Sequence, residues 1–170
     1  MALGNWLRRL FGRPQRAARG SGAPAASFDA TSTWEVTDPG RRAVHIVYAP
    51  RRDGVPDAGE IVWAWVPFQE DPTQGKDRPM LVIARHDVQR CYALKLTSRA
   101  PGGNAARRND HVAIGTGPWD RQGRESWVDL DQLYSVHHRG IRREAAPLDR
   151  RAFARVARVL AQRHGWLFDG

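Results

Sequence analysis

Residues 59–98 read GEIVWAWVPFQEDPTQGKDRPMLVIARHDVQRCYALKLTS, and this stretch decides the fold of the chain. It contains three β-rich runs, at residues 60–66, 80–84 and 91–97. Polar segments with Gly, Pro and Asp separate the runs, which is typical of turns between short strands. The second run is continuously apolar and predicts a buried strand. Short, closely spaced strands without helical patterns between them favour a small antiparallel barrel or sandwich over βαβ units.

The same pattern continues on both sides of this stretch. Upstream, residues 34–36 and 44–48 flank the turn signal Asp38-Pro39-Gly40, and together they predict a β-hairpin. Downstream, the sequence predicts three more short strands, at residues 111–114, 126–130 and 133–136. We therefore expect a mainly β fold.

One helix is predicted near the C-terminus, over about residues 150–164. Asp149 has the side chain of a good N-cap, and Leu148 and Phe153 lie at the spacing of a hydrophobic staple. Gly165 is placed to end the helix. The sequence thus predicts a small antiparallel β-barrel that is completed by a C-terminal α-helix.

The 170 residues are expected to form one folded domain with an N-terminal extension. Residues 1–33 are predicted to be a basic, mobile tail, residues 34–58 the hairpin extension, and residues 59–165 the barrel domain. No window approaches 18 consecutive apolar residues, so stable membrane insertion is not expected. A single cysteine, Cys91, excludes an internal disulfide and is compatible with a reducing, cytoplasmic location.

The net charge of +9 suggests a nucleic-acid partner, but the excess positive charge is concentrated at the two ends of the chain. We therefore expect nucleic-acid affinity to rest on shape and stacking more than on bulk charge, with a shallow salt dependence. Trp63 and Trp65 share one face of their strand and belong in the core or at an interface, the core being favoured. Trp119 and Trp127 lie near loops and are candidates for stacking on bases or packing a partner.

Several kinds of active site have no signature in this sequence. The six histidines show no metal-binding spacing with acids or with one another, so neither a metal nor another cofactor is expected. There is no Gly-x-Ser-x-Gly elbow, no phosphate-binding Gly-x-x-x-x-Gly-Lys-Ser/Thr loop and no dinucleotide fingerprint after a strand.

One combination of motifs is more specific. Gly-Glu-Ile-Val-Trp at residues 59–63 is followed by a loop carrying Gln74-Gly75, by Arg78-Pro79-x-Leu-Val-Ile, and by Leu-Thr-Ser at residues 96–98. This signature resembles the MazF/PemK family of toxins from type II toxin–antitoxin modules. The resemblance covers about residues 59–163. It implies an SH3-like barrel, a homodimer, a cognate antitoxin that blocks the site, and metal-independent endoribonuclease activity on single-stranded RNA.

The resemblance also implies roles for single residues. Arg78 matches the catalytic arginine of the family and Thr97 its catalytic threonine, with Ser98 adjacent. Because an arginine with a pKa above about 12 is hard to deprotonate, Arg78 suits a phosphate clamp better than a general base. Gln74 matches the glutamine of the family loop. The candidate substrate-binding residues are Gln74, Lys76, Glu70, His86 and Trp119.

The general base remains open among Glu70, Asp71, Asp77 and His86. The family loop commonly has an acid beside its glutamine, whereas Pro72-Thr73-Gln74 stands here, so the acids are shifted upstream. Two other readings are a non-catalytic barrel that binds nucleic acid or protein, and a toxin that acts on a protein target such as gyrase.

Overall fold

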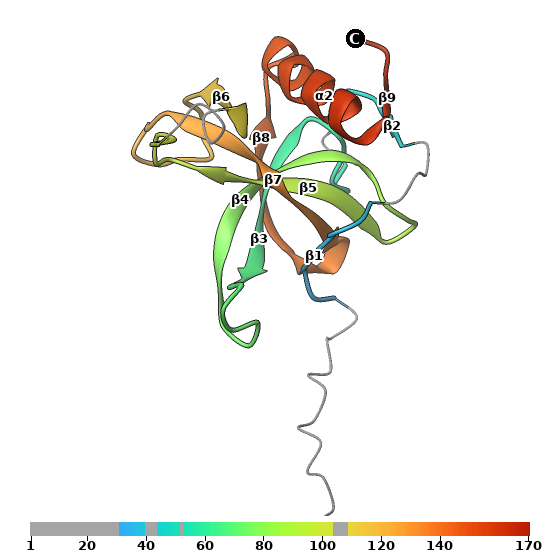
Figure 1. Ribbon diagram of the computed structural model, residues 1–170. Helices are drawn as coiled ribbons and strands as arrows, with labels where there is room; N and C mark the ends of the chain where they lie inside the picture. The colour runs from blue at the N-terminus through green and yellow to red at the C-terminus, as the bar shows by residue number, and fades with distance from the viewer. Residues whose placement is uncertain (1–30, 40–43, 52, 104–108) are drawn as a thin grey trace, which may run out of the picture.

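The computed structural model describes residues 31–39, 44–51, 53–103 and 109–170. The predicted basic tail lies outside the described residues, except for its last three positions. The elements of the described part are β1 (Trp34–Glu35), β2 (His45–Ile46), β3 (Glu60–Pro67), β4 (Gly75–Arg85), β5 (Arg90–Thr97), β6 (His111–Gly115), β7 (Ser126–His137), the 3-10 helix η1 (His138–Gly140), β8 (Ile141–Pro147), α2 (Arg150–His164) and β9 (Leu167–Phe168) (Figure 1).

Seven of the described strands form one antiparallel sheet in the order β1-β7-β5-β4-β3-β8, with β6 also paired to β7. The sheet curls strongly, so that its strands cross one another in the view of Figure 1, and α2 lies at one end of it. This curled half-barrel with one C-terminal helix confirms the predicted fold class. None of the described helices is long and apolar enough to span a membrane.

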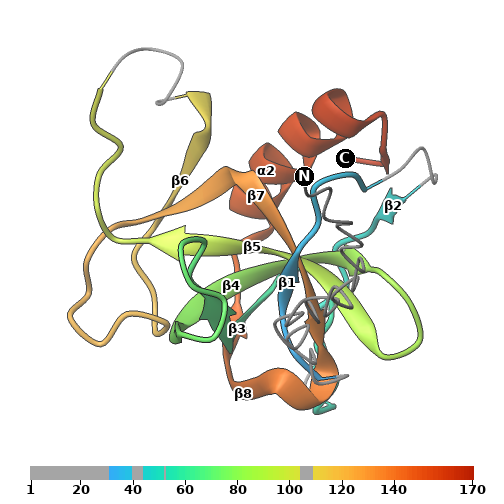
Figure 2. The same ribbon diagram turned by 60° about the horizontal axis from the view of Figure 1, so that its bottom comes forward.

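The predicted hairpin is wrong, because residues 34–36 and 44–48 do not pair with each other. β1 pairs with β7, where Trp34 lies opposite Ser135, and β2 pairs in parallel with β9 at the C-terminal end of the chain. Figure 2 shows β1 running beside β7, while β2 lies near the C-terminal end of α2. The turn signal acts only locally. Each strand instead forms its backbone hydrogen bonds with an open strand edge elsewhere in the fold, and not with its neighbour in the sequence.

Two further elements differ from the sequence prediction. β7 is one strand, not two, because residues 129–132 form a bulge opposite Lys95 and the pairing with β5 resumes beyond them. β8 was not predicted, because its sequence IRREAAP has neither strand-like composition nor alternation. It becomes a strand by pairing with the apolar β3, so tertiary pairing overrides local propensity there.

The sheet is apolar on both faces. One core lies between the sheet and α2, and it includes Ile61, Leu81 and Leu94 from the strands and Phe153 and Leu160 from the helix. The helix begins and ends as predicted, because the Asp149 side chain accepts hydrogen bonds from two backbone N–H groups of its first turn and Gly165 adopts a left-handed conformation.

A second core lies on the opposite face of β3, β4, β5 and β7. Its buried residues are Val62, Ala64, Val66, Met80, Val82, Cys91, Ala93, Tyr134 and Val136. Neither core includes Trp63 or Trp65, which were expected to be in the core. Both tryptophans point to the other side of β3 and are only half-buried, so the preference for the core was wrong.

Candidate active site

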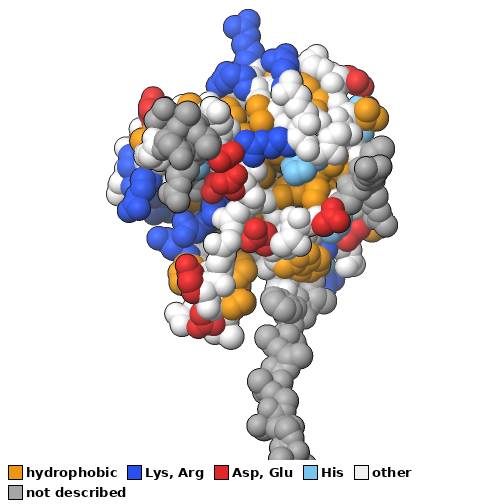
Figure 3. All heavy atoms as spheres, in the orientation of Figure 1, with side chains coloured by type: hydrophobic (Ala, Val, Ile, Leu, Met, Phe, Trp, Pro, Cys, Tyr) orange, Lys and Arg blue, Asp and Glu red, His pale blue; other side chains and the backbone are white. Residues whose placement is uncertain are grey.

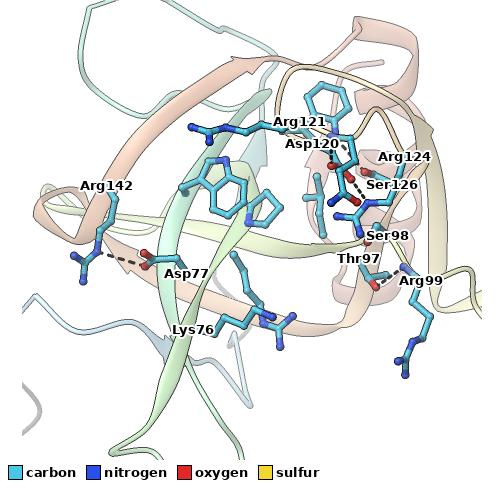
Figure 4. A pocket seen from close by; sticks show the side chains of 16 residues that line it. Lys76, Asp77, Thr97, Ser98, Arg99, Asp120, Arg121, Arg124, Ser126 and Arg142 are labelled. Atoms are coloured by element: carbon cyan, nitrogen blue, oxygen red, sulfur yellow. Dashed lines mark hydrogen bonds and ion pairs between the residues drawn. The ribbon is translucent and has the colours of Figure 1, made fainter.

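A groove of about 980 Å³ opens where β4 begins and β5 ends. Its walls are residues 76–79 of β4, residues 96–99 at the end of β5, and a loop of residues 119–124 that leads to β7. Figure 4 shows Thr97, Ser98 and Arg124 close together on one wall, with Asp77 and Arg142 on the other side of the view. The groove therefore gathers residues from these three segments, together with Trp63 of β3 and Arg142 of β8.

Strand register brings Arg78 and Thr97 together. β4 and β5 are antiparallel with Met80 opposite Lys95, so continuing the register by two residues places Arg78 opposite Thr97. Side chains directly opposite each other in an antiparallel pair lie about 5 Å apart at Cβ. On its other side Arg78 lies opposite Ala64 of β3, whose small side chain leaves room for the guanidinium.

Arg78 and Thr97 both have donor groups that are available to a ligand. Among the residues that the structure describes, the Arg78 guanidinium makes no hydrogen bond or ion pair. The Thr97 hydroxyl accepts a hydrogen bond of 3.1 Å from the backbone N–H of Arg99. Because that bond uses an acceptor lone pair, the hydroxyl hydrogen stays free to donate.

The groove is cationic. Its described lining includes six basic side chains, Lys76, Arg78, Arg99, Arg121, Arg124 and Arg142, and two acidic ones, Asp77 and Asp120. Each acid is paired: Asp77 lies 3.4 Å from Arg142, and Asp120 lies 2.8 Å from Arg124. Lys and Arg side chains also gather on one side of the molecule in the space-filling view (Figure 3).

A network of hydrogen bonds fixes the loop of residues 119–124. The Asp120 carboxylate accepts from Arg124 and from the backbone N–H of Gln122, and these bonds lower the pKa of Asp120. Trp119 is 5% exposed, and its indole N–H donates to the Ser126 hydroxyl. Such a loop holds its cations in a defined place, which favours binding of an anion.

The structure brings together some of the residues predicted from the sequence. Arg78, Thr97, Ser98, Lys76 and Trp119 line the groove. Gln74 and Glu70 do not line it. The Gln74 amide instead donates to Asp71, whose pKa is lowered by hydrogen bonds from Thr73 and Gln74.

His86 and Trp119 do not fit the roles expected of them. His86 follows the far end of β4, eight residues or about 26 Å of strand from Arg78. Its ring stacks on Tyr92 at 4.3 Å and is hydrogen-bonded to Ser135. Trp119 is part of the core beside α2, and Gly117 packs against its ring. A buried ring has no free face for a base, so the stacking role is wrong for Trp119 as the structure stands.

Sequence reasoning missed most of the basic residues of the groove. Arg99, Arg121, Arg124 and Arg142 come from two loops and from β8, and no motif links them. The one signal in the sequence was the spacing of four residues between Asp120 and Arg124. This spacing suits an ion pair, so it indicates that Arg124 is paired and is not a free cation. Among the described residues, no group of three His, Cys, Asp or Glu side chains is placed to hold a metal ion.

Comparison with known proteins identifies the family. A family described as PemK-like, MazF-like toxin of type II toxin–antitoxin system matches residues 57–163. A chain in the crystal structure of MazE–MazF (Form-II) from Deinococcus radiodurans is 28% identical, with a TM-score of 0.50 over 65% of this chain and 96% of that chain. MazF (Form-I) from the same organism is also 28% identical, with a TM-score of 0.50 over 65% and 97%. Curated protein sequences give no match.

The fold and the groove define a small β-barrel toxin. The family match covers more than half of the chain, so this protein belongs to the MazF-like toxins of type II toxin–antitoxin systems. β1 and β2 precede the matched residues and are an addition to the family domain. The Arg78–Thr97 pair lies inside the match and lines the groove.

Proposed function

We propose that this toxin is an endoribonuclease that cleaves single-stranded RNA in the groove between β4, β5 and the loop of residues 119–124. The observation that carries the proposal is the pairing of an unpartnered arginine, Arg78, with a hydroxyl that is free to donate, Thr97, in a groove with four more positive than negative side chains. A guanidinium and a hydroxyl are suited to bind the oxygens of a phosphodiester.

The chemistry is transfer of the phosphoryl group to the neighbouring 2′-oxygen. The 2′-hydroxyl loses its proton and attacks phosphorus, the bond from phosphorus to the 5′-oxygen breaks, and that oxygen takes up a proton. The products are a 2′,3′-cyclic phosphate and a 5′-hydroxyl. Arg78 and Thr97 stabilise the charge on the phosphorane, and Ser98 supplies a further hydroxyl beside them.

Asp77 is the proposed general base. Of the four candidates that the sequence leaves open, Asp77 lines the groove, whereas Glu70, Asp71 and His86 do not. Asp77 precedes Arg78 in β4, so the two side chains leave opposite faces of the strand, and the ion pair with Arg142 holds the Asp77 carboxylate at the groove wall. A carboxylate within reach of the 2′-hydroxyl takes up the proton in the transition state.

The proposal includes the partners that the family implies. MazF of Deinococcus radiodurans has been crystallised as MazE–MazF. We propose that this toxin also has a cognate antitoxin, which covers the groove, and that it acts in the cytoplasm. We also propose a homodimer as the active form. Lys76 belongs to the RNA-binding surface, while Gln74 contacts RNA only if the loop before β4 moves toward the groove.

Analysis of the products of RNA cleavage tests this function. The purified full chain, in excess EDTA, is incubated with a labelled single-stranded RNA, and the products are examined for 2′,3′-cyclic phosphate ends. We expect cleavage with such ends. RNA binding without cleavage would favour the non-catalytic alternative, and a requirement for magnesium would point to another nuclease mechanism.

A further inference from the structure

The added strand β1 makes contact with the segment that leads into the groove. Glu35, on β1, accepts two hydrogen bonds at the same carboxylate oxygen, Oε2. One comes from the Gln69 side-chain amide at 3.3 Å and the other from the Gln132 side-chain amide at 3.0 Å. Gln69 lies in the loop of residues 68–74 between β3 and β4, which we call the β3–β4 loop. Glu35 thus joins β1 both to this loop and to β7.

The contact continues toward the Arg78–Thr97 pair. Gln132 accepts a hydrogen bond from the Lys95 ammonium, which also lies 3.3 Å from the Asp129 carboxylate. Lys95 is two residues before Thr97 on β5, so both side chains point to the same face of the sheet. The pKa of the nearby Tyr134 is raised to about 12, chiefly by burial and then by Glu35 and Asp129, while Arg78 acts to lower it. The charged side chains of Glu35, Asp129 and Arg78 therefore lie around the Tyr134 hydroxyl.

The β3–β4 loop has few other attachments. Its hydrogen bonds run inside the loop, from Phe68 N–H to the Gln74 carbonyl and from Gln74 N–H to the Asp71 carbonyl. At its end, Gly75 lies flat against the Trp65 ring, where a Cβ would come within 2.3 Å of the ring. Among the described residues, the bond of Gln69 to Glu35 is the one hydrogen bond or ion pair that joins loop residues 68–74 to an element outside β3 and β4.

β1 itself is held firmly. The Arg90 guanidinium lies over the Trp34 ring at 3.4 Å and donates hydrogen bonds to the carbonyls of Ser32 and Ser135. Arg90 is buried, so water does not compete strongly for these bonds. Glu35 is therefore a fixed anchor, whereas the β3–β4 loop that it holds is exposed.

We propose that Glu35 is a positioning residue, which tethers the β3–β4 loop through Gln69 and so sets the place at which Lys76 and Arg78 meet RNA. This inference rests on the proposed function, because RNA is the ligand whose binding the tether would favour. Glu35 does not line the groove and takes no part in proton transfer. Glu35 lies outside the residues 57–163 that match the family, whereas Gln69 lies inside them, so the tether joins the added strand to the family domain.

Amide hydrogen exchange of the full-length protein tests the tether without RNA. In Glu35→Ala we expect the amides of Phe68 and Gln74 to exchange about fivefold faster, as for loss of one ordinary hydrogen bond. Gln69→Ala, which cuts the same bond from its exposed end, should give the same increase even if Glu35→Ala folds poorly. Glu35→Gln keeps an acceptor oxygen and should stay close to wild type.

Glu70→Ala is the matched control. It removes a carboxylate from the β3–β4 loop itself, where no hydrogen bond is assigned to that side chain, and should leave the exchange unchanged. The double variant Glu35→Ala/Gln69→Ala should exchange no faster than either single variant, because both remove one interaction. Unchanged exchange in both single variants, or additive effects in the double variant, would overturn the proposal.

Cleavage kinetics separate this proposal from the proposed function. We expect Glu35→Ala and Gln69→Ala to raise KM about fivefold with kcat within twofold of wild type, because the tether acts on binding. A lower kcat with unchanged KM would overturn the positioning role. If wild type cleaves no RNA, the proposed function fails, and the exchange experiment still decides whether the tether exists.

Discussion

Arg78 and Arg90 stand at opposite ends of the same pair of strands, and their surroundings differ completely. Arg90 is 5% exposed, and its guanidinium lies over Trp34 and donates to both the hydroxyl and the backbone carbonyl of Ser135. Arg78 is half-buried in the groove, and its guanidinium has no partner among the described residues.

The difference separates a structural arginine from a binding one. A guanidinium has five N–H donors, and burial without partners costs free energy. Arg90 meets this requirement with the protein itself and so holds β1 to the sheet. Arg78 is half-buried at the wall of an open groove, so its donors are left to water or, in the proposed function, to the phosphate of RNA. The hydrogen-bond and ion-pair partners of each arginine, and not the residue type or the position in the strand, indicate which arginine is available to bind the toxin's target.

Removal of Arg78 should have the largest effect on activity. We expect Arg78→Ala to lower kcat/KM for RNA cleavage by about 1,000-fold, because the cation on the phosphorane is lost, while the melting temperature stays within two degrees or so of wild type. Arg85→Ala is the matched control, since it removes an exposed arginine from the other end of β4. Cleavage at the wild-type rate by Arg78→Ala would contradict the site.

Removal of Arg90 should do the reverse. We expect Arg90→Ala to lower the free energy of unfolding by about 3 kcal/mol, because it deletes a cation–π contact and leaves buried acceptors unpaired. Chemical denaturation measures this loss, and Arg90→Lys should fall between the two proteins. Cleavage per folded molecule should decrease at most modestly. A stable Arg90→Ala variant without any cleavage activity would erase the distinction between the two arginines.

Thr97 is expected to contribute less than Arg78. We expect Thr97→Ala to lower kcat about tenfold, because one neutral hydrogen bond to the phosphate oxygens disappears. Thr97→Ser keeps the hydroxyl and should recover most of the rate. If Thr97→Ser is as slow as Thr97→Ala in initial-rate measurements, the packing of the methyl group matters and not the hydroxyl.

The salt dependence of RNA binding should show the smallest change between variants. Lys76, Arg78, Arg99 and Arg121 have no ion pair among the described residues, and four phosphate contacts give a log–log slope of about −3 for a single strand. With a 2′-O-methylated RNA that cannot be cleaved, Arg121→Ala should make the slope less steep by about 0.7, which is the contribution of one phosphate contact. Arg151→Ala on α2 should not change it, and the opposite pattern would assign binding to the helix.

A slope of about −3 corresponds to a few phosphate contacts, which is the shallow dependence that the sequence predicts. The sequence does not show, however, which side chains make these contacts. The middle of the chain is nearly neutral when its charges are counted, because the acids are as numerous as the arginines there. Folding sorts these charges in space. The two acids of the groove are paired with Arg142 and Arg124, and other acids lie elsewhere. A count of charges along the sequence does not show how the fold places them.

The sequence predicted the parts that rest on local patterns. Alternation and apolar runs give β3, β4 and β5, and Asp149 and Gly165 give the two ends of α2. The family resemblance joins Arg78 with Thr97, whereas the register that places them side by side comes from the structure. The strands and the helix ends depend on period and turn chemistry, which a single sequence carries.

The remaining features depend on contacts between distant residues. β1 pairs with a strand about 100 residues away, and β8 owes its extended form to β3. Trp119 resembles a loop residue in sequence, yet its ring fills the core beside α2. His86 follows the same strand as Arg78 but lies at the wrong end of it. No local pattern reports which end of a strand borders the groove.

The most direct test of the account is the map of the surface that RNA protects. Amide hydrogen exchange of the wild-type protein is measured with and without a 2′-O-methylated single-stranded RNA. We expect slower exchange in residues 76–79, 96–99 and 119–124, and no change in residues 85–92. Protection centred on residues 85–92 or on α2, with the groove unaffected, would contradict the claim that the Arg78–Thr97 groove binds RNA.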